Sequence, residues 1–160
     1  MSDRLDLPKR TGPKPETTRR IPHSQLTHHG SDEVIAKLHD WCFSLPSVTN
    51  EHSGISVPGA RALVLRDGCD CNPDAFMVGR EFAHIHPHPD SGSMHVKLTA
   101  EDAKNVIAAG WGEDHFLVTI GRYPPGLIMV FSPRDDAELD LVKKIVATSY
   151  EFATGNSVAA

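Results

Sequence analysis

The stretch from Arg80 to His95 reads R-E-F-A-H-I-H-P-H-P-D-S-G-S-M-H and carries four of the ten histidines of the 160-residue chain. His84 and His86 are separated by one residue, so on a β-strand both side chains point to the same face. Prolines at 87 and 89 interrupt ladder hydrogen bonding and predict that this strand ends near His86. His88 then lies on a connecting loop.

A second strand follows, in which Met94, Val96 and Leu98 alternate with His95 and Lys97. If the two strands pair with their apolar residues on one side, His84, His86 and His95 share the opposite side. His115, at the start of a later predicted strand, can join them. The sequence therefore predicts one face that gathers four imidazoles.

Three interpretations fit such a set of histidines. The His-x-His pair with His95 as a third imidazole suits zinc, iron, copper or nickel. The same groups also suit a general base with hydrogen-bond donors, because imidazole titrates near neutral pH. In the third interpretation they are polar residues on a solvated sheet face. The spacing alone leaves these alternatives open.

The elements that must position these residues follow from apolar periodicity and capping residues. Helices are predicted at 32–45, after Ser31, at 99–109 and from Asp135 to Gly155. Strands are predicted at 61–66, 76–86, 93–98, 115–120 and 127–131, and residues 46–60 read as a loop. In strand 76–86, Phe82 is expected on the face of His84. Short turns between neighbouring strands favour antiparallel pairing. The predicted fold class is α+β, with a mainly antiparallel sheet and helices packed on one face.

Residues 1–30 differ in composition from the rest of the chain. They carry six basic and three acidic residues, four prolines and few apolar side chains. Such a segment buries too little apolar area to offset its chain entropy. We therefore expect a disordered basic tail at 1–30, with His23, His28 and His29 outside the site, and one domain over 31–160.

Composition also narrows the class of partner. The net charge is −5 overall and −8 over residues 31–160, which argues against binding led by phosphate contacts. Apolar runs stay well below the ~20 residues of a membrane-spanning helix. Three cysteines are too few for a disulfide scaffold. We expect a cytoplasmic protein with a small-molecule substrate, and neither nucleic acid nor membrane as a partner.

An ordered set of motifs then becomes informative over residues 80–154. It comprises R-E-F-A-H-I-H at 80–86, M-H-V-K-L at 94–98, A-G-W-G-E-D-H at 109–115, S-P-R-D-D at 132–136 and a V-x-x-I-V helix ending near Tyr150. Together these resemble the luciferase-like domain family, which includes the fungal luciferases. A weaker, architectural likeness to the MmcQ/YjbR-like fold also implies an α+β domain.

The family resemblance implies roles for particular residues. It places His84, His86, His95 and His115 at catalytic positions, whereas His88 departs from the pattern. It also marks four residues as substrate-binding: Arg80, Glu81, Trp111 and Arg134.

The resemblance further implies an oxygenase that uses dioxygen, without flavin or nicotinamide, on a small hydroxylated aromatic or pyrone-type compound. A histidine would remove the hydroxyl proton, and other imidazoles or an arginine would stabilise the oxyanion. Two alternatives remain: a non-catalytic small-molecule or protein-binding module, and an enzyme with a transition metal on His84, His86 and His95.

Overall fold

The computed structural model describes residues 5–66 and 71–158. The order of helices and strands is α1 (Asp32–Cys42), β1 (Val48–His52), β2 (Arg61–Leu65), the 3-10 turn η1 (Pro73–Ala75), β3 (Glu81–Ile85), β4 (Met94–Lys97), α2 (Ala100–Ala108), β5 (Gly112–Asp114), α3 (Phe116–Thr119), β6 (Leu127–Val130) and α4 (Asp136–Thr154). Six strands form one sheet in the order β1-β2-β3-β4-β6-β5, and the neighbouring strands pair antiparallel. The predicted α+β class is confirmed.

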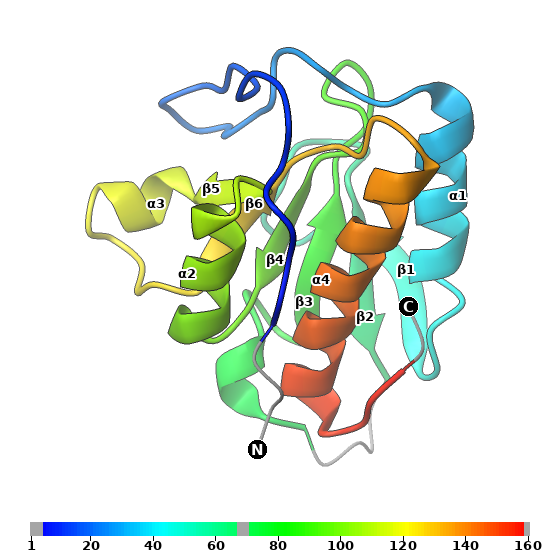
Figure 1. Cartoon of the computed structure of the whole chain (residues 1–160). Helices are drawn as coiled ribbons and strands as arrows, with labels where there is room; N and C mark the ends of the chain where they lie inside the picture. Colours follow the sequence, from blue (N-terminus) through cyan, green and yellow to red (C-terminus); the bar gives the residue numbers. More distant parts are fainter. Residues whose placement is uncertain (1–4, 67–70, 159–160) are drawn as a thin grey trace.

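One face of the sheet is covered by helices α1, α2 and α4 (Figure 1). The apolar residues of β3, β4 and β6 turn toward this layer and pack with the buried stripe of α4, which includes Leu139, Val142 and Ile145. Full burial of such a side chain is worth about 1.5–3 kcal/mol. The helices therefore hold the sheet from one side and leave its other face for polar residues.

The predicted caps explain where the helices begin and end. Ser31 accepts a hydrogen bond from the Val34 N–H, and Thr99 accepts one from the Asp102 N–H. Asp135 caps α4 in the same way, and Gly155 ends it in the left-handed conformation with φ of 75°.

An irregularity in β3 decides which side chains reach the open face. The pairing with β2 shifts register between Leu63 and Val64, so that Leu63 faces Ala83 and Val64 faces Glu81. Strict alternation predicts that Phe82 shares the face of His84. Because of the shift, Phe82 instead joins Ala83 in the core. The shift places Glu81 on the side of His84.

Several predicted segments differ in the structure. The strand predicted at 76–86 begins only at Glu81, and the helix predicted at 32–45 ends at Cys42. Residues 115–120 form helix α3 rather than a strand, because His115 caps a helical turn whose residues are not fully buried. The strand in this region is β5, which approaches β6 so closely that a Cβ at Gly112 would lie 2.4 Å from the Met129 carbonyl oxygen. Residues 46–60, expected as a loop, contain the edge strand β1.

Composition predicts a disordered segment at 1–30, but residues 5–30 follow a defined path. The first part lies on the helix side, where Leu5 is buried, Lys144 Nζ donates to the Asp6 carbonyl and Trp111 Nε1 donates to the Pro8 carbonyl. The chain then forms a hairpin near β5 and α3, in which Thr17 and Gln25 are bridged (Figure 1). Polar and backbone contacts to the domain hold this segment, which a count of apolar residues does not register.

Among the described residues, no helix combines the length and apolar character needed to cross a membrane.

Candidate active site

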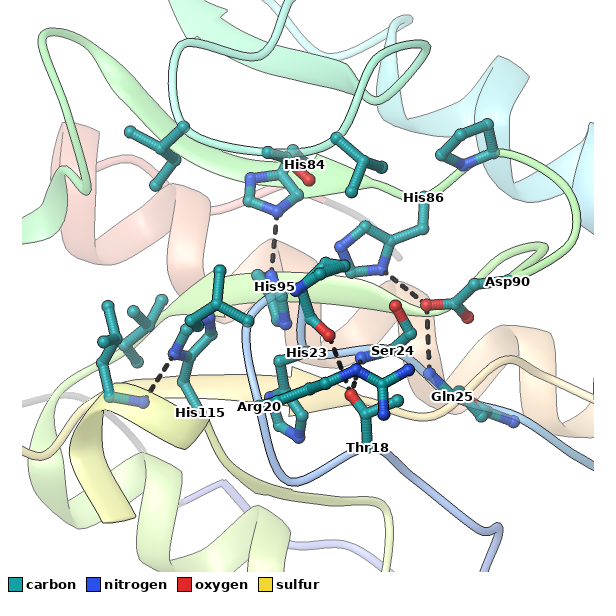
Figure 2. Close-up of a pocket in the computed structure, with 18 of the residues that line it drawn as sticks. Thr18, Arg20, His23, Ser24, Gln25, His84, His86, Asp90, His95 and His115 are labelled. Atoms are coloured by element: carbon teal, nitrogen blue, oxygen red, sulfur yellow. Dashed lines mark hydrogen bonds and ion pairs between the residues drawn. The ribbon is translucent and has the colours of Figure 1, made fainter. Parts of the chain in front are cut away.

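A cavity of about 830 Å³ lies on the side of the sheet that faces away from the helices. Six histidines line it. His88 is exposed, whereas the other five imidazoles, those of His23, His84, His86, His95 and His115, gather in one cluster (Figure 2). They come from the N-terminal segment, from β3 and the residue after it, from β4, and from the start of α3. All five side chains are buried. The volume falls in the ~300–1,000 Å³ range of small-molecule sites.

Antiparallel pairing of β3 and β4 brings the first two imidazoles together. His84 and His95 are direct cross-strand partners, and His84 Nε2 lies 2.9 Å from His95 Nδ1. On its other side His84 Nδ1 lies 2.8 Å from a carboxylate oxygen of Glu81. Glu81 also accepts hydrogen bonds from the Ser53 hydroxyl at 2.7 Å and the Gly54 N–H at 2.9 Å.

This chain of hydrogen bonds has a direction. Burial acts to raise the pKa of Glu81, but hydrogen bonds from His84, the Gly54 N–H and Ser53 outweigh it and lower that pKa. An ionised carboxylate only accepts, so His84 donates from Nδ1. In a neutral His84 ring Nε2 then accepts from the Nδ1–H of His95. The remaining lone pair is on His95 Nε2, which is buried and has no hydrogen-bond partner among the described residues.

His86 is oriented by a second carboxylate. Its Nδ1 lies 2.8 Å from the Ser93 hydroxyl and 3.3 Å from Asp90. Ser93 gives its own proton to Asp90 at 2.7 Å, and therefore accepts the Nδ1–H of His86. The backbone N–H of Gln25 donates to the same carboxylate at 3.0 Å. The lone pair of His86 is thus on Nε2.

His115 presents the opposite polarity. Its Nδ1 accepts the Leu117 N–H at 3.0 Å, so in the neutral ring the proton is on Nε2. Burial, with the neighbouring imidazoles, lowers the pKa of His115 to about 4. At neutral pH this residue is therefore an uncharged N–H donor beside His95, with ring centroids 4.4 Å apart.

His95 and His86 are neutral for a similar reason. Burial, followed by the electrostatic influence of neighbouring imidazoles, lowers the pKa of each well below its ordinary value. Both are consequently lone-pair acceptors at neutral pH. A base of this kind removes a proton only from a hydroxyl that is itself acidic, such as an enol conjugated with a carbonyl group.

His23 completes the cluster, although sequence reasoning assigned it to a disordered tail. Its Nε2 lies 2.9 Å from Glu113, and its Nδ1 accepts the Phe116 N–H at 3.3 Å. Burial acts to raise the pKa of Glu113, but hydrogen bonding with His23 and the charge of Lys14 lower it, so the carboxylate accepts from His23. Both nitrogens of His23 are therefore occupied.

The four predicted substrate-binding residues lie in different parts of the structure. Glu81 lies behind His84, as described above. Arg80 donates to the carbonyls of Leu65 and Arg66, and Trp111 is a core residue. Arg134 pairs with Glu138 near the start of α4. The residues that line the cavity do not include Arg80, Trp111 or Arg134.

The sequence did not predict several residues of the site, and only some of them have partners that are distant in sequence. Asp90, Ser93 and Gln25 orient His86, while Glu113 and Thr17 meet near His23. The first two lie within the histidine-rich stretch, so an acidic residue and a hydroxyl beside it were available signals. The pairing of Gln25 and His23 with residues about 65 and 90 positions later gives no local pattern.

The family model of the luciferase domain matches residues 79–149, a span that contains four of the five clustered histidines. The match covers the sheet strands β3 to β6 and most of α4. The chain therefore contains a luciferase-like domain, which confirms the resemblance found in the sequence.

Similarity to particular proteins extends further along the chain. A luciferase from Armillaria ostoyae is 28% identical over 168 residues, and one from Neonothopanus nambi is 27% identical over 173 residues. Each alignment covers 94% of this chain and 62% of the relative. The chain thus spans somewhat less than two thirds of the length of these fungal luciferases. No solved structure matches it.

Proposed function

We propose that this protein is an oxygenase that acts on a small hydroxylated aromatic or pyrone-type compound, with dioxygen as the second substrate and no organic cofactor. The observation that supports this most directly is the chain Glu81–His84–His95. It ends at the wall of a cavity in a buried nitrogen, His95 Nε2, that has no hydrogen-bond partner among the described residues. The luciferase-like domain supports the same reaction class.

The first step is removal of the hydroxyl proton by His95 Nε2. As His95 becomes protonated, its Nδ1–H polarises toward His84, and the Glu81 carboxylate offsets the developing positive charge through His84. The substrate becomes an enolate or phenolate. The neutral Nε2–H of His115 is available to donate a hydrogen bond to that oxygen.

The second step is reaction of the electron-rich carbon with dioxygen. The carbon supplies an electron pair in total, a carbon–oxygen bond forms, and dioxygen is reduced to a bound peroxide anion. The proton held on His95 then passes to the peroxide, which restores the neutral imidazole. Atoms and charge balance without a flavin or nicotinamide.

The wall of the cavity suits this reaction. Its lining includes the buried Leu127 and the half-exposed apolar side chains of Ile21, Leu26 and Ile55, which suit the ring of an aromatic or pyrone-type compound. Arg20, from the N-terminal segment, lies among the lining residues (Figure 2) and its positive charge favours the anionic form of the bound compound.

Dioxygen uptake by the purified protein, measured with a panel of hydroxylated pyrones and phenols, tests this function. We expect His95→Gln to lower uptake by about 100-fold or more, the usual range for loss of a general base, without changing the thermal midpoint by more than a few degrees. His39→Gln, on the exposed side of α1, is the matched control.

Equal uptake by wild type and His95→Gln would overturn the proposal. If compounds of the panel raise the thermal midpoint but wild type consumes no dioxygen, the pocket is instead a non-catalytic binding site.

A further inference from the structure

We propose that the nitrogens of His84, His86 and His95 form a binding site for one divalent transition-metal ion such as Zn²⁺ or Co²⁺. Each of the three buried residues offers one nitrogen, and these atoms all lie within 4.8 Å of one another. Imidazole nitrogens bind Zn²⁺ at about 2.0–2.1 Å, so small side-chain rotations suffice to close such a set around an ion. The site shares its residues with the proposed oxygenase but does not depend on that reaction.

The outer contacts of two of these imidazoles are those of metal ligands. His84 donates Nδ1–H to Glu81, and His86 donates Nδ1–H to Ser93, which is held by Asp90. Ligating histidines usually donate their second N–H to a carboxylate, a carbonyl or water, which fixes the ring and raises the basicity of the other nitrogen. The acceptor lone pair of each ring is thereby on Nε2, and that of His84 faces His95 Nδ1.

His95 supplies the third nitrogen. Its Nδ1 lies 2.9 Å from His84 Nε2, a contact that one shared proton explains and that one shared ion can replace. The ring centroids are 4.4 Å apart for His86 and His95, 4.9 Å for His84 and His95 and 5.1 Å for His84 and His86, so the three imidazoles are mutual neighbours. Three neutral nitrogen ligands favour a borderline transition ion over Mg²⁺ or Ca²⁺, which prefer oxygen.

A second group of histidines is close enough to bind an ion but lacks the lone pairs. His23, His95 and His115 also offer nitrogens within 4.8 Å of one another. However, both nitrogens of His23 are used by Glu113 and the Phe116 N–H, and the Nδ1 of His115 is used by the Leu117 N–H. Hydrogen-bond direction therefore selects the set His84, His86 and His95.

A metal ion bound at this site would block the proposed reaction. An ion on His95 Nδ1 leaves the proton on Nε2, so His95 can no longer accept a proton from a substrate hydroxyl. Ion binding and proton removal by His95 exclude each other. Zn²⁺ is therefore expected to inhibit dioxygen uptake, and a chelator is expected to restore it.

The test is a Co²⁺ titration of the full-length protein after treatment with a chelator, followed by visible absorption and by displacement with Zn²⁺. We expect one ion per chain, with d–d bands of a nitrogen-ligated site. His86→Gln and His95→Gln should weaken binding on the order of 100-fold or more, and Glu81→Gln about 10- to 100-fold. His115→Gln and His88→Gln should bind as wild type does.

Absence of Co²⁺ bands and of any Zn²⁺-dependent thermal shift in wild type would overturn the metal site. Loss of binding in His115→Gln would contradict the selected set of ligands. Because the substituted proteins could unfold, wild type loaded with Cu²⁺ provides a second measurement. Its electron paramagnetic resonance spectrum should show superhyperfine coupling to three nitrogens, and coupling to fewer than two would also overturn the proposal.

The two proposals fail separately. Ion binding together with undiminished dioxygen uptake would retain the metal site and contradict His95 as the base. Uptake that depends on His95, without ion binding, would retain the oxygenase and remove the metal site.

Discussion

Identical side chains acquire different chemistry in this site through the partner of a single ring nitrogen. His95 and His86 keep an acceptor lone pair, because their Nδ1–H groups are donated to His84 and Ser93. His115 keeps a donor, because its Nδ1 accepts a backbone N–H. His23 is occupied on both sides and holds the N-terminal segment against β5 and α3. The cluster therefore combines bases, a donor and a structural residue.

In the proposed reaction Glu81 is a positioning residue that acts through His84. Glu81→Gln removes the charge that stabilises a protonated His95 and permits the wrong tautomer of His84. We expect kcat for dioxygen uptake to fall about 10- to 100-fold with little change in KM, as for removal of other outer-shell carboxylates. Glu81→Asp should recover part of the loss. A proportional rise in KM at constant kcat would instead indicate direct substrate binding by Glu81.

Sequence patterns predicted the common face of His84, His86 and His95, since alternation along a strand fixes it. They could not predict the role of Glu81 behind His84, because strict alternation puts residue 81 on the opposite face. The register shift at Phe82 reverses that placement. Nor could they assign proton positions, which depend on the partners that folding supplies.

At the scale of elements, capping residues predicted helix positions well, whereas short strands and turns were less determined. Helix α4 begins after Asp135 and ends at Gly155, as predicted. Residues 115–120 have strand-like composition but contain helix α3. His115 caps this helix, and β5 already occupies the edge of the sheet beside β6. The local sequence pattern does not show which of two neighbouring segments pairs with β6.

The start of α4 also holds the N-terminal segment, through a pair that depends on pH. Arg134 donates to Glu138 and to the Thr11 carbonyl. Burial acts to raise the pKa of Glu138, but its hydrogen bonds with Arg134 lower it below the ordinary value of 4.5. A carboxylate with a lowered pKa stabilises the fold above its ordinary pKa, and this contribution is lost as the pH falls through the folded value.

We therefore expect Glu138→Gln to lower the free energy of unfolding by about 1–3 kcal/mol at pH 7. The difference from wild type should shrink on acidification toward pH 3. Urea denaturation at several pH values measures it. A difference that stays constant between pH 7 and pH 3 would contradict the role of the ionised pair.

The two faces of the sheet have different roles in the whole molecule. Helices α1, α2 and α4 bury the apolar face, while the histidines occupy the other beneath residues from the N-terminal segment (Figures 1 and 2). That segment passes from one face to the other, so its first residues join the core and its hairpin contributes His23 and Gln25 to the site. Composition alone does not show such a wrapped arrangement.

Gln25 joins the hairpin to the domain and provides a test of this arrangement. Its side-chain oxygen accepts the Ser132 N–H at 2.9 Å, and its backbone N–H donates to Asp90. Gln25→Ala leaves a buried N–H unsatisfied and should cost about 1–3 kcal/mol. Hydrogen exchange should show faster exchange at residues 17–26 with β3 and β4 unchanged. Glu16→Ala, an exposed neighbour, is the control, and equal exchange in both variants would contradict the proposed anchoring.

In the proposed reaction, His95 removes the substrate proton before the substrate reacts with dioxygen. The most direct test of this step is the rate of dioxygen uptake by wild type and by His95→Gln, both freed of metal ions and supplied with the same 3-hydroxypyrone. We predict turnover by wild type without added metal, and a loss of about 100-fold or more in the variant. Equal rates in the two proteins, or turnover by wild type only after a metal is added, would contradict it.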